Sequence, residues 1–286
     1  MNIDFQYLRL LRRILEEGEV KKNRTGIDTI ALAGATIEHD MSEGFPLLTT
    51  KKVAFKSIKV ELEGFIKGIR SKKWFQERGC TIWNEWCNPK KVPYSHDEET
   101  KKRMLEEDDL GPIYGVQWRN FSSPMDQPAG VDQLKNILKT LESDPNDRRM
   151  ICSAWNPMLL DQMALPPCHL LWQVTVIDGK LNLAWYQRSV DTPLGLPFNI
   201  ASYGLLLHLL TRHANLRAGK LIGFLMDTHI YVNQIEAIKD QIRREPKELP
   251  SVNTEGKSSS IFDWNHTKTK LTNYNPHPSI KIPIAI

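Results

Sequence analysis

The sequence of 286 residues lacks the marks of several specialised classes of protein. It has no uninterrupted run of about 18 apolar residues, the length that a membrane-spanning helix needs. Its first residues, MNIDFQYLRLLRRILEEGE, mix acidic and basic side chains, unlike the basic and then apolar order of a signal peptide. We therefore expect no membrane partner and a cytoplasmic location, meaning the host cytoplasm if the source is viral.

An excess of charge of one sign is also missing. The 38 Lys and Arg residues against 34 Asp and Glu residues leave a formal net charge of +4, which is too small to predict a nucleic-acid partner. Hydrophobic residues make up 41% and charged residues 25% of the chain. These values are ordinary for a globular protein, so disordered, collagen-like and coiled-coil classes are excluded.

Cysteine is scarce and its spacing is wide. The four cysteines are Cys80, Cys87, Cys152 and Cys168, which form none of the short pairs that zinc sites favour. Four cysteines in a chain of this length do not make a disulfide scaffold either. We expect no metal, and any chemistry of these cysteines should be nucleophilic.

The hydrophobic periodicity predicts a single α+β domain over residues 1–286, with a mixed or antiparallel twisted sheet flanked by helices. Asp-Gly at 178–179 separates two apolar runs and predicts a β-hairpin. The polar stretch at about 88–130 is expected to be a surface excursion. The predicted helices are 4–17, 55–69, 131–141, 200–214 and 231–244, and the predicted strands are 29–39, 150–155, 169–177 and 180–188.

Cys168 is the candidate nucleophile. It follows two prolines in MALPPCHLLWQ at the start of a predicted strand. Neighbouring strand residues point to opposite faces, so His169 is not expected to deprotonate the thiol. A cation that lowers the thiol pKa is needed instead, and Arg188 lies on the strand predicted to pair with this one. A buried structural cysteine is the alternative that the sequence leaves open.

Other charged groups predict an anionic ligand. Turn-forming residues flank Arg24, and they also flank the neighbouring pair Arg148 and Arg149. Guanidinium groups bind phosphate oxygens in a bidentate way. A solvated charged surface is the alternative for any single one of them. Glu61 lies on an otherwise apolar helix face and is a candidate buried acid, with an ordinary surface ion pair as the alternative.

Ten strings in order along the chain resemble the thymidylate synthase family. They cover nearly the whole sequence and are followed by a closing PHPSIKIPIAI that resembles the family as well. The strings are RTG, GFPLLTTKK, TIWNEW, LGPIYGVQWR, NDRRMICSAWNP, MALPPCH, YQRSVD, LGLPFNIASY, DTHIY and REPKELP.

The resemblance implies a homodimer that packs sheet to sheet, in which Arg148 and Arg149 enter the partner's site. It implies dUMP and a reduced folate, 5,10-methylenetetrahydrofolate, as the two substrates. The implied catalytic residues are Cys168, Glu61, Tyr114, His169, Arg188, Asn199 and Asp191. The implied dUMP-binding residues are Arg24, Arg148, Arg149, Gln187, Arg188, Ser189, Asp191, Asn199, His229 and Tyr231. The implied folate-binding residues are Lys51, Ile82, Trp83, Trp86, Leu165, Asp191, Leu194, Gly195, Phe198, Tyr231, Ala285 and Ile286.

The implied reaction is the reductive methylation of dUMP to dTMP. The Cys168 thiolate adds to C6 of uracil, which makes C5 an enolate carbon that attacks the folate methylene. Loss of the C5 proton expels tetrahydrofolate and leaves an exocyclic methylene on the ring. Hydride from the tetrahydrofolate completes the methyl group, dihydrofolate is released and the cysteine departs.

Two other functions remain open at this point. The related hydroxymethylases add water instead of hydride and make 5-hydroxymethyl-dUMP, and residues 63–64 and 27–28 differ from the usual synthase pattern, as do residues 225–226. A non-catalytic, RNA-binding module is the other alternative, although the low net charge speaks against it. An amide at Asn199, where relatives acting on cytosine carry Asp, favours dUMP over dCMP.

Overall fold

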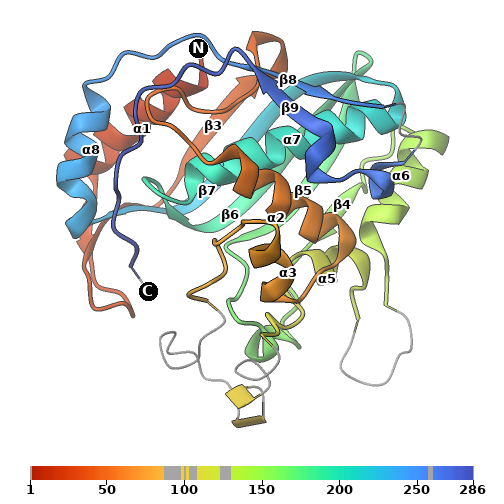
Figure 1. Ribbon diagram of the computed structural model, residues 1–286, viewed down its shortest axis with the longest axis horizontal. Coiled ribbons are helices and arrows are strands. Elements are labelled where there is room, and N and C mark those ends of the chain that lie inside the picture. Colours follow the sequence, from red (N-terminus) through yellow and green to blue (C-terminus); the bar gives the residue numbers. More distant parts are fainter. Residues whose placement is uncertain are drawn as a thin grey trace.

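One twisted mixed sheet organises the fold, and helices lie in front of it in the view of Figure 1. The computed structural model describes residues 2–86, 98–99, 101–102, 108–122, 130–256 and 260–285. Strands β6 and β7 are parallel, and the other paired strands are antiparallel. Across the sheet the order is β1 (Glu19–Lys21), β2 (Thr29–Leu32), β7 (Arg217–Tyr231), β6 (Lys180–Asp191), β5 (His169–Ile177) and β4 (Ile151–Ser153), and β3 (Ala35–Asp40) also pairs with β7.

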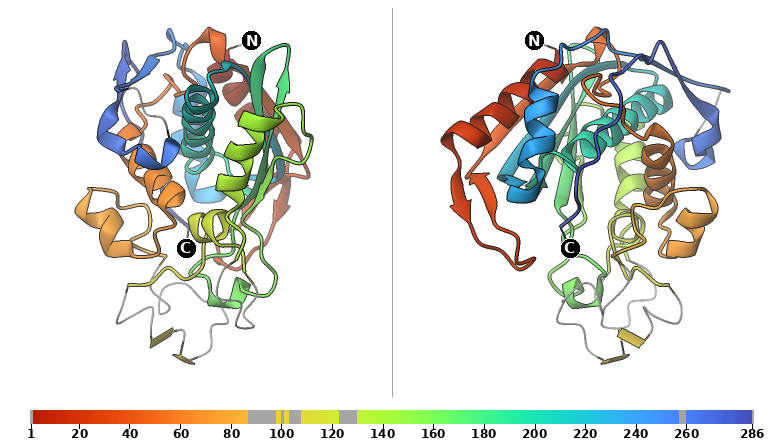
Figure 2. Two further views of the ribbon diagram at one scale, coloured as in Figure 1. Left: turned by 90° about the vertical axis from the view of Figure 1, so that its right-hand side faces the viewer. Right: turned by 60° about the vertical axis from the view of Figure 1, so that its left-hand side comes forward.

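Helices cover the sheet and complete the predicted α+β fold. Helix α7 packs against β6 and β7, and α2 packs against α7, so these helices form successive layers on one face of the sheet (Figure 2). A small second sheet pairs β8 (Ser251–Thr254) with β9 (Thr269–Thr272). The helices are α1 (Ile3–Glu17), α2 (Phe55–Lys67), α3 (Lys72–Glu77), α5 (Gly115–Arg119), α6 (Gln133–Ser143), α7 (Leu196–Ala214) and α8 (Ile235–Ile242).

The structure contains the β-hairpin turn and the buried apolar helix that the sequence predicts. Asp178 and Gly179 have φ angles of 51° and 65°, and these positive values make the tight turn that joins β5 to β6. Helix α7 is apolar on nearly all sides, and most of it is buried between the sheet and α2. The end of β6 leads directly into α7, and the Thr192 N–H donates to the His229 carbonyl at 3.0 Å, so the ends of β6 and β7 lie beside the start of α7.

The region around residue 231 differs from the prediction. Tyr231 ends the 15-residue strand β7, and the helix predicted to begin there begins at Ile235 as α8. Two features hide this strand: glycine interrupts it at 219 and 223, and its pairing with β6 is parallel. The prediction therefore assigns Tyr231, the last residue of the strand, to the first turn of the helix.

The other strands also differ in detail. The strand predicted at 29–39 is two strands, β2 and β3, which pair with successive parts of β7. The strand predicted at 150–155 shortens to β4, and its Ile151 is 46% exposed instead of buried. That exposed residue belongs to the sheet face that lacks α7, where Ile222 and Phe224 of β7 also lie.

The unusual pair Glu63-Gly64 has a structural explanation in α2. A Cβ atom at position 64 would overlap the Phe75 ring of α3, so glycine lets this ring pack directly against the helix. Glu63 is 3% exposed and accepts hydrogen bonds from the Lys67 ammonium at 2.5 Å and from the His266 backbone N–H at 2.9 Å. Its carboxylate thus connects α2 to the segment before β9.

The predicted surface excursion lies partly outside the described residues, which leave out 87–97, 100, 103–107 and 123–129. Within it, Leu110, Ile113 and Trp118 are buried, so this part packs into the body of the domain. The chain ends with an extended segment whose Ile282 and Ala285 are nearly buried against that body. Among the described residues, no helix combines the length and the apolar character needed to cross a membrane.

Candidate active site

A cavity of about 720 Å³ opens where the ends of β6 and β7 meet the start of α7. Helix α2, the tryptophan-bearing segment after α3, residues 21–29, the loop before β5 and the C-terminal segment also line it. It gathers most of the site residues that the sequence predicts. These are Arg24, Glu61, Ile82, Trp83, Trp86, Tyr114, Leu165, Cys168, His169, Gln187, Arg188, Ser189, Asp191, Leu194, Gly195, Phe198, Asn199, His229, Tyr231 and Ala285.

Cys168 is held on the cavity wall by hydrogen bonds to its backbone. Its N–H donates to the Tyr114 phenol oxygen at 2.9 Å, and its carbonyl accepts from the Arg188 N–H at 2.9 Å. The Arg188 guanidinium donates to the carbonyls of Pro166 and Pro167, both at 2.8 Å. Arg188 therefore fixes the residues that carry the thiol, and its charge lies close to the sulfur.

The electrostatics of Cys168 differ from the expectation that nearby cations lower its pKa overall. Burial has the largest effect and raises the pKa of the thiol, while Arg188 and then Arg24 act in the opposite direction. Asp191 adds to the upward shift. The two arginines thus offset part of the burial effect, and the net pKa of Cys168 stays above its ordinary value.

His169 also lines the cavity, although strand alternation predicts that it points away from Cys168. Cys168 precedes β5, and a β-bulge follows His169, so the alternation does not hold here. The His169 ring lies 2.8 Å through Nδ1 from the Tyr203 hydroxyl and stacks on Tyr114 with ring centroids 4.3 Å apart. Burial lowers the pKa of His169 to about 3, which makes it a poor base for the thiol.

Glu61 is the buried acid that the sequence predicts. Its side chain comes from α2, lines the cavity and is only 6% exposed. Burial raises the pKa of Glu61 to about 7, and the Trp83 indole acts in the opposite direction. At neutral pH this carboxyl group can therefore both give and accept a proton.

Asn199 occupies the first turn of α7, and its carboxamide is joined to β6. The Asn199 Oδ1 atom accepts a hydrogen bond from Gln187 Nε2 at 3.1 Å. Gln187 is 2% exposed, and its Oε1 accepts from the Trp185 indole at 3.1 Å. The Asn199 amide is thus held by Gln187 of β6, and it provides hydrogen-bonding groups for a flat polar ligand.

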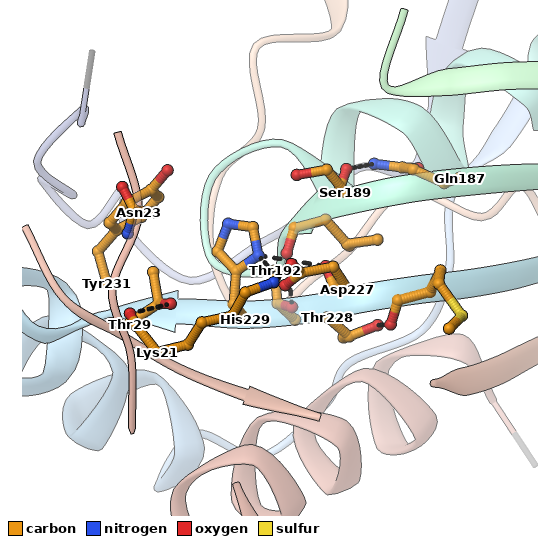
Figure 3. Close-up of polar contacts among 12 residues, drawn as sticks. Lys21, Asn23, Thr29, Gln187, Ser189, Thr192, Asp227, Thr228, His229 and Tyr231 are labelled. Atoms are coloured by element: carbon orange, nitrogen blue, oxygen red, sulfur yellow. Dashed lines mark hydrogen bonds and ion pairs between the residues drawn. The ribbon is translucent and has the colours of Figure 1, made fainter. Parts of the chain in front are cut away.

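Sequence reasoning missed Lys21 and Asp227, which form an ion-paired group on β1 and β7 together with the predicted His229 (Figure 3). The Lys21 ammonium pairs with Asp227, and the other Asp227 oxygen lies 3.0 Å from Nδ1 of His229. The hydrogen bond with His229 has the largest effect on Asp227 and lowers its pKa to about 2. Asp227 stands within the string DTHIY, which was its available signal. Lys21 had none, because β1 is short and exposed.

Asp191 connects the end of β6 to the C-terminal segment. Its carboxylate accepts from the Leu194 N–H at 3.0 Å and lies 3.3 Å from the Gln234 amide nitrogen. The same nitrogen donates to the Pro283 carbonyl at 3.0 Å. Burial raises the pKa of Asp191, and the hydrogen bond from Leu194 is the largest opposing effect.

Several predicted site residues are not part of this cavity wall. Lys51 is 5% exposed, its ammonium donates to the Pro193 carbonyl, and burial lowers its pKa to about 8. Arg148 and Arg149 precede β4 and are exposed to solvent, and Arg149 pairs with Asp147 at 2.8 Å. The predicted contact of Ile286 lies outside the described residues.

The cavity suits organic ligands. Over the part of the chain that the structure describes, no group of three or more His, Cys, Asp or Glu side chains is arranged to hold a metal ion. The aromatic and aliphatic side chains of Ile82, Trp83 and Phe198 form an apolar wall opposite the polar ends of β6 and β7. Such a wall fits a flat ring system beside a polar ligand.

Comparison with known proteins identifies the family of this chain. The chain is 44% identical to a thymidylate synthase of Corynebacterium aurimucosum over 284 residues, which is 99% of this chain and 98% of that protein. The family model described as thymidylate synthase matches residues 5–286. The chain therefore belongs to the thymidylate synthase family, as the ten strings in its sequence predict.

Proposed function

We propose that this protein catalyses the reductive methylation of dUMP to dTMP with 5,10-methylenetetrahydrofolate, through covalent attack of Cys168 on uracil C6. Membership of the family makes the protein a methyltransferase of the thymidylate synthase kind. One observation carries the assignment of residues: a single cavity brings the Cys168 thiol, the Asn199 amide and the Glu61 acid together against an aromatic wall.

Nucleophilic attack is the role of Cys168. Arg188 holds the backbone before the thiol and, together with Arg24, favours its negative form. The same two arginines, together with Ser189, are the proposed ligands of the dUMP phosphate. Attack of sulfur on C6 moves the electron pair of the C5–C6 double bond toward O4, where a hydrogen-bond donor must stabilise it.

Asn199 and Glu61 are the proposed groups around the pyrimidine. The Asn199 amide recognises N3 and O4, and protonated Glu61 donates toward O4 through water. Tyr114 and His169 form the polar surface near C5, from which the proton leaves. His229 and Tyr231 bind the ribose hydroxyl, while Gln187 holds Asn199 in place.

The folate supplies the one-carbon unit and the hydride. Its flat ring system fits the apolar wall, and Asp191 lies between the two ligands. Lys51 is proposed to act near the folate glutamate tail from its position behind the wall. The residues that would hold the folate are Ile82, Trp83, Trp86, Leu165, Asp191, Leu194, Gly195, Phe198, Tyr231 and, at the C-terminus, Ala285 and Ile286.

A homodimer that packs sheet to sheet completes the proposed site. The face of the sheet that lacks α7 carries Phe224 and Met226, which are 46% and 48% exposed, and Ile151 at 46%. Covering this apolar face by a second copy would bury all three side chains. Arg148 lies at its edge, where its carbonyl accepts from Gln173, and this position supports the proposal that Arg148 and Arg149 enter a partner's phosphate site.

Mass spectrometry of the product tests this function. Incubation of dUMP with the folate is expected to give a nucleotide heavier by one CH₂ group, together with dihydrofolate. A product heavier by CH₂O, with tetrahydrofolate left unchanged, would instead identify the hydroxymethylase, which the comparisons do not favour. A Cys168→Ser variant should form no covalent adduct with 5-fluoro-dUMP and the folate, whereas the parent protein should carry it at residue 168.

The dimer has a separate test. Mixing Cys168→Ser subunits with subunits that carry Arg149→Ala should restore activity in hybrid dimers, because one of the two sites then has both an intact thiol and intact arginines. No gain above the two separate variants would contradict the shared site. The cytoplasm and the lack of a nucleic-acid partner remain predictions from the sequence.

A further inference from the structure

We propose that Trp185 is a positioning residue for the pyrimidine, which acts through Gln187 to fix the orientation of the Asn199 carboxamide and thereby favours uracil over cytosine. The inference rests on the proposed function, because it concerns how the same site chooses its base. Trp185 lies on β6, is 1% exposed and is absent from the cavity wall. It can therefore act on the ligand only through other residues.

The hydrogen bonds give each amide one orientation. An indole N–H can only donate, so Gln187 must turn its oxygen toward Trp185. The Gln187 nitrogen is then left to donate to the Ser189 carbonyl at 3.2 Å and to Asn199 Oδ1 at 3.1 Å. With Oδ1 directed at Gln187, the Nδ2 group of Asn199 is the part of this amide available to donate to a ligand.

This orientation separates the two pyrimidines by their chemistry. Uracil carries a carbonyl oxygen at C4, which accepts a hydrogen bond from an amide nitrogen. Cytosine carries an amino group there, which is itself a donor and faces Nδ2 without a partner. A reversed Asn199 would favour cytosine, because Oδ1 could then accept from that amino group.

The surroundings of Trp185 hold its indole in one position. Gly223 lies directly opposite on β7, and a Cβ atom there would lie 2.6 Å from the indole ring. On its other side the indole stacks on Tyr203, with ring centroids 5.2 Å apart and an interplanar angle of 14°. Tyr203 contacts His169, so the same indole supports a second polar residue of the cavity wall.

The expected effect is moderate, since the Ser189 carbonyl also orients Gln187. One hydrogen bond contributes a small net free energy, which corresponds to a change of about two- to tenfold in an equilibrium constant. The experiment measures the dissociation constants of dUMP and dCMP by calorimetry for the full-length protein and for Trp185→Phe. The ratio that favours dUMP should fall about two- to tenfold in Trp185→Phe.

Trp172→Phe is the matched control. Trp172 pairs with Trp185 across β5 and β6 and is equally buried, but its indole N–H has no hydrogen-bond partner among the described residues. This control should keep the parent ratio. An unchanged ratio in Trp185→Phe, or an equal fall in both variants, would overturn the inference.

Two additions keep the result interpretable. If Trp185→Phe does not fold, a benzothienyl amino acid at position 185 keeps the indole shape and removes only the donor, with the same expected fall. Asn199→Asp serves as the positive control for lost preference. Failure of the parent protein to bind dUMP would refute the proposed function, whereas normal binding with an unchanged ratio would refute only the role of Trp185.

Discussion

The phenol oxygen of Tyr114 accepts a hydrogen bond of 2.9 Å from the backbone N–H of Cys168. Tyr114 has a positive φ of 27° just before α5, an unfavourable conformation for a residue with a side chain. Its ring stacks on Phe65 of α2, with centroids 5.0 Å apart. The tyrosine is therefore held where it supports the nucleophile.

Tyr114→Phe tests this support. The change removes the acceptor that fixes the Cys168 backbone, so the thiol is held less precisely and formation of the covalent intermediate should slow by up to about 100-fold. Rapid-quench measurement of adduct formation with 5-fluoro-dUMP checks the expectation. Tyr274→Phe, which removes an acceptor of the Val53 backbone N–H outside the cavity wall, is the control and should react at the parent rate. Parent-like kinetics in Tyr114→Phe would contradict the role.

Arg24→Gln tests the charge near the thiol. Burial raises the pKa of Cys168, and Arg188 and Arg24 oppose this, so removal of Arg24 should raise it further. Fewer molecules then carry the thiolate at pH 8, and alkylation of Cys168 by iodoacetamide should slow about threefold or more. Peptide mass spectrometry follows residue 168 as a function of pH. Arg13→Gln, a change at an exposed position on α1, should leave the pH midpoint of alkylation unchanged. An equal shift of this midpoint in both variants would exclude a specific effect of Arg24.

Glu61→Gln should lower activity and raise stability. Loss of the proton donor should reduce kcat by about 100-fold or more. The folded pKa of about 7 lies above the ordinary 4.5, so burying this carboxyl group destabilises the protein increasingly as pH rises between these values. The variant should therefore gain up to about 3 kcal/mol relative to the parent between pH 4.5 and pH 8.

Urea unfolding of both proteins at equal concentration, at pH 5 and at pH 8, measures this difference. A constant difference between the two pH values would mean that Glu61 titrates as an ordinary carboxyl group. A parent-like kcat at pH 7 would separate Glu61 from proton transfer. Glu236→Gln, an exposed position on α8, is the control for removal of one surface charge.

Glu63→Gln should have the opposite pH dependence. Burial alone would raise the pKa of Glu63, but hydrogen bonds from Lys67 and His266 outweigh it and lower the pKa overall. Stability from this carboxylate is present above its ordinary pKa of 4.5 and is lost as pH falls through the lower folded value. The variant should lose about 1–3 kcal/mol at pH 7 and less in acid, as measured by urea unfolding. An equal loss at all pH values would point to packing instead.

Much of the fold and most of the cavity wall can be predicted from the sequence. The Asp178-Gly179 turn works because both residues accept a positive φ, and α7 is long and apolar enough to be identified. Strand β7 could not be identified in the same way. Its two glycines weaken the strand pattern, and its partner β6 is reached only through the whole of α7.

Side-chain networks were the part that spacing could not predict. Lys21 meets Asp227 only because β1 pairs with β2, and β2 with the end of β7. The net pKa of Cys168 depends on how far the upward effect of burial exceeds the downward effect of the two arginines. No sequence motif specifies this balance. Trp185 reaches Asn199 through a second side chain, so its position in the string before YQRS gives no sign of this link.

The contact between Gly64 and Phe75 has a historical consequence. A larger residue at position 64 collides with the phenyl ring, whereas a smaller residue at position 75 first opens the space that it needs. Substitutions at the two positions should therefore be epistatic, because the room for a side chain at position 64 depends on the residue at position 75. A change from a bulky residue at position 64 to the present pair would therefore meet less steric conflict if the glycine arose before the phenylalanine.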